Sequence, residues 1–567
     1  MVIRHLRWQI ALALAGTLLI GLFIALVSHR VLQTRPAQGG QYVEAVVGPP
    51  GTFNPLLAQT DAEVDSVRLL FSGLTRPGDR GLVEPDLAER WAVSADGRAY
   101  TFTLRADAVW HDLEPVTADD VVFTARLAAD PAIPATQKSR LCEPWQRVEV
   151  SALDARTVEI RLKEPYAPFL NATALGILPA HVLADANPAD IPADAFSSRA
   201  PIGSGPYRLE TIDRAADAPG PAVRFARFDR HWAATEGQPY LDSIVFQHYP
   251  NRELALEALG QRSAQGLGWV PTKVLSRLGS ETPIQFFSAI KTGYTLVYLS
   301  PVEPFTNKTV RQALAMALDR QRIIDDPALL DGQAVPAAGP IAPGSWAYFA
   351  GLGTPIHDPE QARRMLDEAG WIDSEGDGVR DRDGQPLSFG LSVKGDDPVM
   401  LAIAERLRED WQQIGVAAEI LPIGPSDLAS TLRNRSYSAL LFSWDLRDYD
   451  PDPYALWHSS QADFPGQNYA GFKNTDADRI LVEARQAHPV NDHERRRQLY
   501  AEFQRIFAAE QPALVLWHPV YNYAVVDDNV GGIQLPALVV EPADRFATLP
   551  SWFVRVERVF GEASDRR

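Results

Sequence analysis

Cysteine is nearly absent from this chain of 567 residues, since Cys142 is the only one. A single thiol excludes an intramolecular disulfide framework, a zinc site built from several cysteines and an iron–sulfur cluster. Cys142 itself is either an inert packing residue, the usual role of a lone cysteine, or a nucleophile. Basic residues are fewer than acidic ones, with 54 lysines and arginines against 72 aspartates and glutamates, which gives a net charge of −18. Such a charge disfavours nucleic-acid binding.

The sequence lacks the motifs of several common enzyme classes. It contains no G-x-x-x-x-G-K-[ST] phosphate loop, no H-E-x-x-H zinc helix and no G-x-S-x-G nucleophile elbow. Its eleven histidines include no pair spaced i and i+4. Acids are numerous enough to leave a glycosidase-type carboxylate pair open, but no pair stands out. We therefore expect a protein that is not an enzyme.

The one long apolar run lies near the N-terminus. Residues 8–27 carry no charge and follow Arg4 and Arg7. A helix of this length measures about 30 Å, which matches the hydrocarbon core of a bilayer. A cleaved secretory signal is the alternative, but the residues from Ser28 onward make a poor small-x-small cleavage site. We expect an uncleaved membrane anchor, a flexible tether over 29–40 and an exported body.

Beyond residue 40 the sequence predicts a mixed α/β fold, with strands and helices interleaved along the chain. Two helices carry clear capping signals, because Thr117 precedes acids of a first turn and Asp358 precedes Pro359. No fixed repeat period is present, which argues against a solenoid or propeller. The clearest strands are expected at 42–47, 99–104, 157–162, 243–249, 294–299 and 513–517, and the clearest helices at 118–128, 307–319, 358–369, 397–414, 475–487 and 492–509.

Several motifs in a fixed order connect the chain to a known family. The longest block covers residues 84–124 and reads EPDLAERWAVSADGRAYTFTLRADAVWHDLEPVTADDVVFT. Shorter pieces are F-N-P-L at 53–56, G-S-G-P-Y at 203–207, V-R-Q-A-L at 310–314 and N-Y at 468–469. In order and spacing these pieces resemble the extracytoplasmic solute-binding proteins of family 5, the peptide class, which serve ABC importers.

The resemblance implies a type II periplasmic-binding-protein fold, in which two α/β lobes and an extra subdomain close about a hinge. It implies a monomer outside the cytoplasm that captures a peptide or similar solute and passes it to the permease subunits of an ABC transporter. The expected divisions are 1–40 for anchor and tether, 41–79 and 199–290 for lobe I, 80–198 for its extra subdomain, 291–515 for lobe II and 516–567 for the return to lobe I.

The expected ligand contact is the segment 442–457, FSWDLRDYDPDPYALW, which combines four acids with several aromatics. A ligand ammonium entering a dry cleft needs a fixed carboxylate. The resemblance implies an aspartate shortly after a tryptophan, which fits Asp448 best and Asp450 next; a solvated acidic loop is the alternative. Trp444 and Tyr449 are expected to line the site, although core packing is equally open for Trp444.

Two departures from the family pattern concern the surroundings of the ligand. The anchor replaces the lipid-modified cysteine common in the family, and residues 262–269, RSAQGLGW, stand in place of a short Gly-x-x-Asp turn. We therefore expect an altered contact from lobe I. No residue is assigned to a ligand carboxylate, because Arg447 is near only along the chain and a solvated arginine is the default expectation.

An acidic segment at 373–384, DSEGDGVRDRDG, resembles the start of a calcium loop. Asp373, Glu375 and Asp377 alternate, a glycine follows, and Asp381 holds the ninth place. The twelfth place is a glycine instead of the usual glutamate, and no helix pair clearly flanks the segment. A structural calcium ion is one interpretation, and an acidic hairpin turn between a helix and a strand is the other. No other cofactor is expected.

Three functions stay open at this point. The first is a binding protein for an importer, with peptide as the main solute and a nickel chelate or oligosaccharide as alternatives. The second is a hydrolase that uses paired acids in a cleft. The third is an anchored sensor or chaperone with the same fold. Thermal stabilisation by peptides separates the first from the third, and product analysis tests the second.

Overall fold

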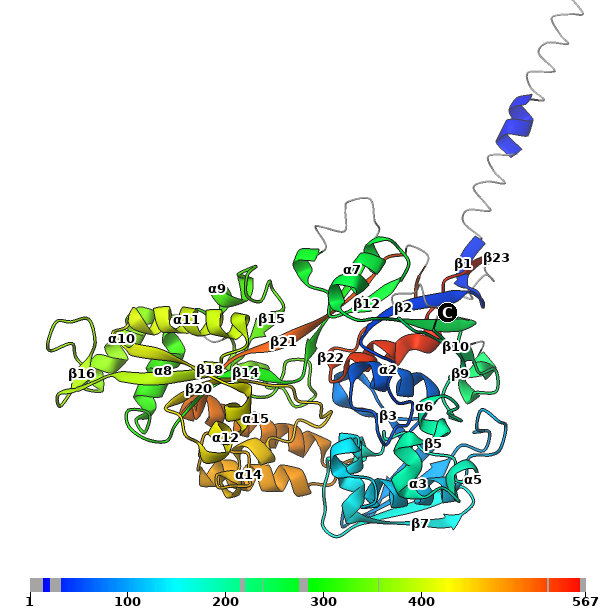
Figure 1. Ribbon diagram of the computed structural model, residues 1–567, viewed down its shortest axis with the longest axis horizontal. Coiled ribbons are helices and arrows are strands. Elements are labelled where there is room, and N and C mark those ends of the chain that lie inside the picture. Colours follow the sequence, from blue (N-terminus) through cyan, green and yellow to red (C-terminus); the bar gives the residue numbers. More distant parts are fainter. Residues whose placement is uncertain are drawn as a thin grey trace, which may run out of the picture.

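The computed structural model describes residues 14–20, 32–214, 220–236, 238–274, 284–354, 356–527 and 530–560. They form two lobes connected by the long strand β21 (Ala513–Val525), which crosses from one lobe to the other (Figure 1). The expected two-lobed α/β fold is thereby confirmed. Of the expected anchor at 8–27, only 14–20 fall within these residues, and they are helical. No helix in the described ranges combines the length and apolarity that a bilayer crossing requires.

One sheet of thirteen strands runs through both lobes. Its main path is β19-β18-β20-β14-β21-β12-β2-β11-β10-β9, with β13, β15 and β22 paired beside it. The bounds are β2 Gln41–Val47, β9 Tyr207–Asp213, β10 Ala222–Arg227, β11 Ser243–Tyr249, β12 Gly266–Gly268, β13 Gln285–Lys291, β14 Tyr294–Leu299, β15 Ala334–Pro336, β18 Ser388–Lys394, β19 Ala417–Ile423, β20 Ala439–Trp444 and β22 Leu538–Val539. Among the strands that the structure describes, β21 is the one that pairs with strands of both lobes.

The lobes are joined where β21 changes partners. Its first part, up to Trp517, pairs with β14, and its second part, from Val520 onward, pairs with β13. A second crossing is the turn between β13 and β14, where Gly293 has a φ of +100°. A side chain at Gly293 would collide with the carbonyl oxygen of Trp444, so glycine is required by space as well as by conformation. Two crossings of this kind form a hinge.

Lobe II is a sheet covered by helices on both faces. Successive side chains of β14 point to opposite faces, so Val297 and Leu299 pack with α8, α10 and α11, whereas Leu296 and Tyr298 pack with α14 and α15. The bounds are α8 Lys308–Ala317, α9 Arg320–Asp325, α10 Pro359–Glu368, α11 Pro398–Gln412, α12 Pro425–Asn434, α13 Tyr454–Trp457, α14 Thr475–Gln486 and α15 His493–Glu510; a short hairpin pairs β16 (Asp381–Arg382) with β17 (Gln385–Pro386).

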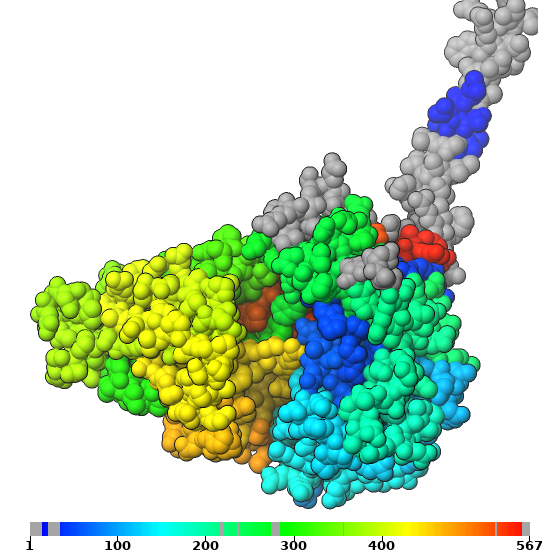
Figure 2. Space-filling model, viewed as in Figure 1, coloured from blue at the N-terminus to red at the C-terminus, as the bar shows by residue number. Residues whose placement is uncertain are grey.

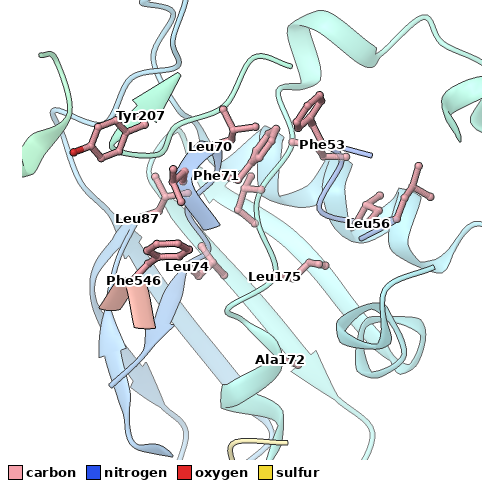
Figure 3. Close-up of a cluster of buried hydrophobic side chains, with 14 of the residues drawn as sticks. Phe53, Leu56, Leu70, Phe71, Leu74, Leu87, Ala172, Leu175, Tyr207 and Phe546 are labelled. Atoms are coloured by element: carbon pink, nitrogen blue, oxygen red, sulfur yellow. The ribbon is translucent and has the colours of Figure 1, made fainter. Parts of the chain in front are cut away.

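Lobe I shares one hydrophobic core with the subdomain inserted into it. Phe71, Leu74 and Leu87 meet Phe546 of the returning C-terminal segment in this core (Figure 3). The inserted part has a four-stranded antiparallel sheet in the order β5-β6-β8-β7, with α3 packed against β7. The bounds are α2 Asp61–Leu70, α3 Ala118–Ala129, α4 Phe169–Ala172, α5 Ala180–Leu183, α6 Ala195–Ser198, α7 Arg252–Gly260, β3 Thr75–Pro77, β4 Val83–Pro85, β5 Ala88–Val93, β6 Ala99–Leu104, β7 Val148–Asp154 and β8 Thr157–Leu162.

The C-terminal segment is held to lobe I by a buried ion network. The guanidinium of Arg545 donates to Glu44 on β2 at 2.8 Å and to both oxygens of Asp65 on α2 at 2.8 and 2.5 Å. Tyr523 on β21 donates a further hydrogen bond to Glu44, at 2.7 Å. Beyond this network the last strand, β23 (Val556–Phe560), pairs with β1 (Leu32–Pro36), so both ends of the described body lie together (Figure 1).

Candidate ligand-binding site

The surface is hollowed between the lobes, and atoms of β21 are visible inside the hollow (Figure 2). A loop of residues 445–453 lies along this region. It leaves lobe II at the end of β20 and stops at the start of α13. Its side chains contact α2, the turn at 140–142 and the segment 541–544, all outside lobe II. The loop therefore contacts both sides of the cleft.

Trp444 forms the edge of an aromatic cluster in lobe II. Its indole N–H donates to the hydroxyl of Tyr298 at 2.8 Å. Its ring stacks on Tyr469 with 6.2 Å between centroids and 7° between planes. The side chain is half-buried, so packing within lobe II does not cover it completely. Lobe II fixes the orientation of the indole, and part of its surface stays available to a ligand.

Arg447 connects the lobes. Its guanidinium lies 3.1 Å from Asp61 at the start of α2 and 3.0 Å from Asp445. Asp445 in turn pairs with Lys291 in the hinge turn. Although burial lowers the pKa of Arg447, Asp445 and Asp61 raise it by a larger amount. Only 24% of the Arg447 side chain is exposed, so the expectation of a solvated arginine is wrong.

Asp448 is the exposed carboxylate of the loop. Its side chain is 79% exposed, and its ion pair with Arg140 is 3.5 Å long. Desolvation raises its pKa and Arg140 lowers it, whereas Asp452, Glu143 and Glu541 raise it further. The carboxylate is thus accessible and has negatively charged neighbours, a setting that suits a cationic group.

Tyr449 fastens the loop to lobe I. Its hydroxyl donates to Asp544 at 2.6 Å and accepts from Arg68 at 3.1 Å. Arg68 also pairs with Asp544 directly, at 3.2 Å. The Tyr449 carbonyl lies against Gly81, which has no room for a side chain on that side. Because its hydroxyl is engaged twice, Tyr449 can offer a ligand only its ring.

Asp450 and Asp452 are both engaged inside the protein. The two carboxylate oxygens of Asp450 accept from Nη2 of Arg496 at 2.8 Å, and Asp450 is 5% exposed. Burial raises the pKa of Asp450, and Arg496 opposes that rise. Asp452 pairs with Arg485 at 2.8 Å. Of the two aspartates expected to bind an ammonium, the structure leaves Asp448 accessible and places Asp450 in a buried ion pair.

A cavity of about 690 Å³ lies beside the loop, on the lobe I side. It is bordered by α2, the β3–β4 hairpin, residues 138–141, residues 534–550 and, from lobe II, Arg447 and Tyr449. Its volume lies within the range of small-molecule sites. Charged side chains of both signs line it, among them Asp86, whose pKa burial raises to about 6. Trp444 and Asp448 lie outside this lining.

The acidic segment at 373–384 is held by its own hydrogen bonds. Asp373 accepts from three backbone N–H groups at 2.7 to 3.2 Å, and Asp381 accepts from the hydroxyl of Ser374. Across the described residues, no group of three or more histidine, cysteine, aspartate or glutamate side chains is placed to hold a metal ion. The β16–β17 hairpin begins inside this segment, at Asp381, as the interpretation of an acidic hairpin turn expects.

Cys142 is buried inside lobe I, beneath the turn that carries Arg140. Burial raises the pKa of its thiol to about 12. A thiol with a raised pKa and no solvent access is a poor nucleophile. The packing role of Cys142 fits these observations, and the nucleophile role does not.

Residues 83–466 match the model of bacterial extracellular solute-binding proteins, family 5 (middle region). The chain belongs to this family. Its members are solute-binding proteins of transport systems, not enzymes, and they act outside the cytoplasm. The resemblance drawn from the ordered motifs is thereby confirmed.

Relatives of this solute-binding protein cover nearly its whole length. The oligopeptide-binding protein AppA of Bacillus subtilis (strain 168) is 30% identical over 88% of this chain and 90% of its own. The dipeptide-binding protein of Escherichia coli (strain K12) is 27% identical over 90% and 94%. The structure of Bacillus subtilis AppA with a nonapeptide has a TM-score of 0.65 at 28% identity, covering 92% and 99%. HbpA2 from Haemophilus parasuis shares the fold, with a TM-score of 0.75 at 24% identity, covering 88% and 97%.

The sequence did not reveal the lobe I partners of the loop in this solute-binding protein. Asp61, Arg140 and Asp544 come from three distant segments, and each is an ordinary charged residue in its own context. The one local signal was the acid at the first position of α2, which also fits a helix N-terminus. The loop itself was identifiable, but its partners depend on tertiary folding.

Proposed function

We propose that this family 5 protein captures a peptide between its lobes and delivers it, chemically unchanged, to the permease subunits of an ABC importer. The observation that carries the proposal is the accessible carboxylate of Asp448 on the loop that contacts both lobes. Support for peptide as the solute comes from relatives named for oligopeptide and dipeptide binding, and from a related fold that holds a nonapeptide.

Asp448 is the proposed partner of the peptide ammonium. Its ion pair with Arg140 is long, so an incoming ammonium can approach at a shorter distance than Arg140 does. Glu541 lies close enough to add to the negative potential at Asp448, although it is itself paired with Arg140. The half-buried indole of Trp444 is the proposed apolar wall, since a flat rigid ring accepts varied side chains.

The first test asks whether the protein retains a peptide from a mixture. The full-length chain, washed free of copurified solute, is incubated with a tryptic digest of casein and repurified, and the retained material is identified by mass spectrometry. We expect one or more intact peptides. Each, added at 100 times its Kd, should then raise the free energy of unfolding by about 2.7 kcal/mol. Cleaved products would indicate a hydrolase, and a chain that retains and responds to no peptide would contradict the proposal.

Replacement of Asp448 by asparagine tests the ammonium contact. A charge-assisted hydrogen bond contributes about 1.5–3 kcal/mol, so Asp448→Asn should weaken binding of the retained peptide by roughly tenfold or more. The same peptide with an acetylated N-terminus should bind wild type and variant alike. Asp463→Asn, at an exposed position elsewhere in lobe II, is the control. Equal losses for free and acetylated peptide, measured by calorimetry, would remove the ammonium role.

We further propose that residues 8–27 anchor the protein, as a monomer, to the outer face of the cell membrane. The support is the uncharged length of this segment, which matches a bilayer core. Fractionation of cells expressing the chain should place it in the membrane, and removal of residues 1–31 should release it from the membrane. Release of the unaltered chain by processing near residue 28 would contradict the anchor.

A further inference from the structure

Trp269 has an unusual backbone conformation beside the hinge. It follows β12 directly and has a φ of +60°, a region that bulky residues rarely occupy. Its ring packs edge-on against Tyr521 of β21, with 5.1 Å between centroids. At Gly268 a side chain would collide with the Tyr521 hydroxyl, so the backbone lies directly on that ring. This packing fixes the half-buried indole of Trp269 in place, at an energetic cost to the backbone.

Arg252, the first residue of α7, lies against the same segment. Its Nη1 donates to the carbonyl oxygens of Trp269 at 2.5 Å and of Gly268 at 3.3 Å. Within the part of the chain that the structure describes, Arg252 forms no ion pair, and its Nε and Nη2 make no hydrogen bond. Burial lowers the pKa of this guanidinium, as expected for a half-buried cation without a carboxylate partner. The buried Tyr521 hydroxyl nearby likewise has no hydrogen-bond partner among the described residues.

The position of this pair relates it to the interlobe loop. The ammonium of Lys291, which pairs with Asp445 of the loop, lies 6.0 Å from the centre of the Trp269 ring. Asp61, which pairs with Arg447 of the loop, is close enough to Arg252 to raise its pKa. Trp269 and Arg252 therefore lie on the lobe I side of the hinge, near the residues that pair with Asp445 and Arg447 of the loop.

We propose that Arg252 binds a carboxylate of the solute, with the indole of Trp269 as the adjacent wall. The Nε and Nη2 edge of a guanidinium matches the two oxygens of a carboxylate, and a bidentate pair of this kind is strong and specific. A ligand carboxylate would also supply the counter-charge that this half-buried cation lacks. The inference rests on the proposed function, and it specifies the ligand as a peptide with a free C-terminal carboxylate.

The test uses the peptide that the wild-type chain retains from a tryptic digest of casein, resynthesised with a free and with an amidated C-terminus. Wild type should bind the free acid at least tenfold more tightly than the amide, because a charge-assisted pair contributes about 1.5–3 kcal/mol. Arg252→Gln should lose most of its affinity for the free acid and bind the amide as wild type does. Arg208→Gln, an exposed position on β9 at the far end of the lobe I sheet, is the matched control.

The outcomes separate the two proposals. If wild type retains no peptide, the proposed function fails. If wild type binds peptides but Arg252→Gln binds acid and amide with the wild-type ratio, the assignment of Arg252 fails while peptide capture stands. A loss of equal size for both forms, with an unchanged thermal midpoint of the ligand-free variant, would also overturn it. Arg252→Lys, which keeps the charge without the planar fork, should recover part of the preference for the acid.

Discussion

At the scale of single residues, Arg545 is the central cation of a buried ion network. It neutralises two buried carboxylates, Glu44 and Asp65, that come from different elements of lobe I. Desolvation raises the pKa of both acids, and Arg545 counteracts that rise. A buried ion network contributes little compared with well-packed apolar residues, but removing one member leaves uncompensated charge. The network therefore makes the C-terminal return to lobe I specific.

Replacement of Arg545 by methionine should be strongly destabilising. It leaves Glu44 and Asp65 buried without a counter-charge, and we expect a loss of about 3–5 kcal/mol in the free energy of unfolding. Chemical denaturation of the full chain measures it. Arg497→Met is the control, because Arg497 pairs with Glu494 at the surface, and its midpoint should stay close to that of wild type. Similar midpoints for the two variants would show that the buried network does not hold the C-terminal segment.

At the scale of elements, most of the regular structure could be predicted from the sequence. The strands expected at 99–104, 157–162, 243–249 and 294–299 have the bounds of β6, β8, β11 and β14. Short alternating or continuous apolar runs bounded by turn residues are compatible with few structures other than a strand. The expected helices also lie within two residues of those observed at each end. The strand expected at 513–517 continues to Val525, so its predicted end is wrong.

The end of this strand was predicted too early because Pro519 follows shortly after residue 517. Proline normally ends a strand because it lacks an N–H for the ladder. Here Pro519 lies opposite Ala334 of β15, at the point where the other edge of β21 has left β14 and has yet to pair with β13, so that edge does not require its N–H. The candidate site, too, could be predicted only in part from the sequence. The segment 442–457 was recognisable from its composition, but the ion pairs that engage Asp450 and Arg447 depend on residues distant in sequence.

The crossing strand also carries a pH-sensitive group. His518 is 1% exposed, and its Nδ1–H donates to the carbonyl of Gly293 in the other crossing at 2.8 Å. Burial lowers the pKa of His518 to about 4, whereas an unfolded histidine has a pKa of about 6.5. The unfolded chain therefore binds the proton more readily. Stability from this group is complete above about pH 6.5 and is lost as the pH falls toward 4.

Replacement of His518 by asparagine should remove this part of the pH dependence while keeping a hydrogen-bond donor. Between pH 6.5 and 4 the free energy of unfolding of wild type should fall more steeply than that of His518→Asn, by about 1.4 kcal/mol per pH unit. Urea denaturation across this range measures both slopes. Parallel slopes would show that His518 does not titrate differently in the folded state.

At the scale of the whole molecule, ion pairs and hydrogen bonds within the protein itself cross the cleft. Arg447 pairs with Asp61, Asp448 with Arg140, and Tyr449 bonds to Asp544. All of these contacts use one loop, so opening the lobes must break them together. Such contacts shift the balance between open and closed forms without any contribution from the solute.

Replacement of Arg447 by glutamine should shift this balance toward the open form. The pair with Asp61 is partly exposed, so its loss should cost the closed form about 1 kcal/mol, roughly a fivefold change in the ratio of closed to open molecules. Small-angle scattering of the ligand-free chain should report a larger radius of gyration for Arg447→Gln than for wild type. Arg408→Gln, which removes a surface pair with Glu405 in lobe II, should leave the radius unchanged.

The pairing of β1 with β23 determines how any load on the N-terminus is distributed. Residue 32 enters the body at lobe I, next to β23, the last described strand, and within the described ranges β21 and the turn at Gly293 are the two segments that continue into lobe II. A leash attached ahead of residue 32 would thus restrain the first lobe alone. Lobe II could then rotate about the hinge without restraint while the protein stayed attached.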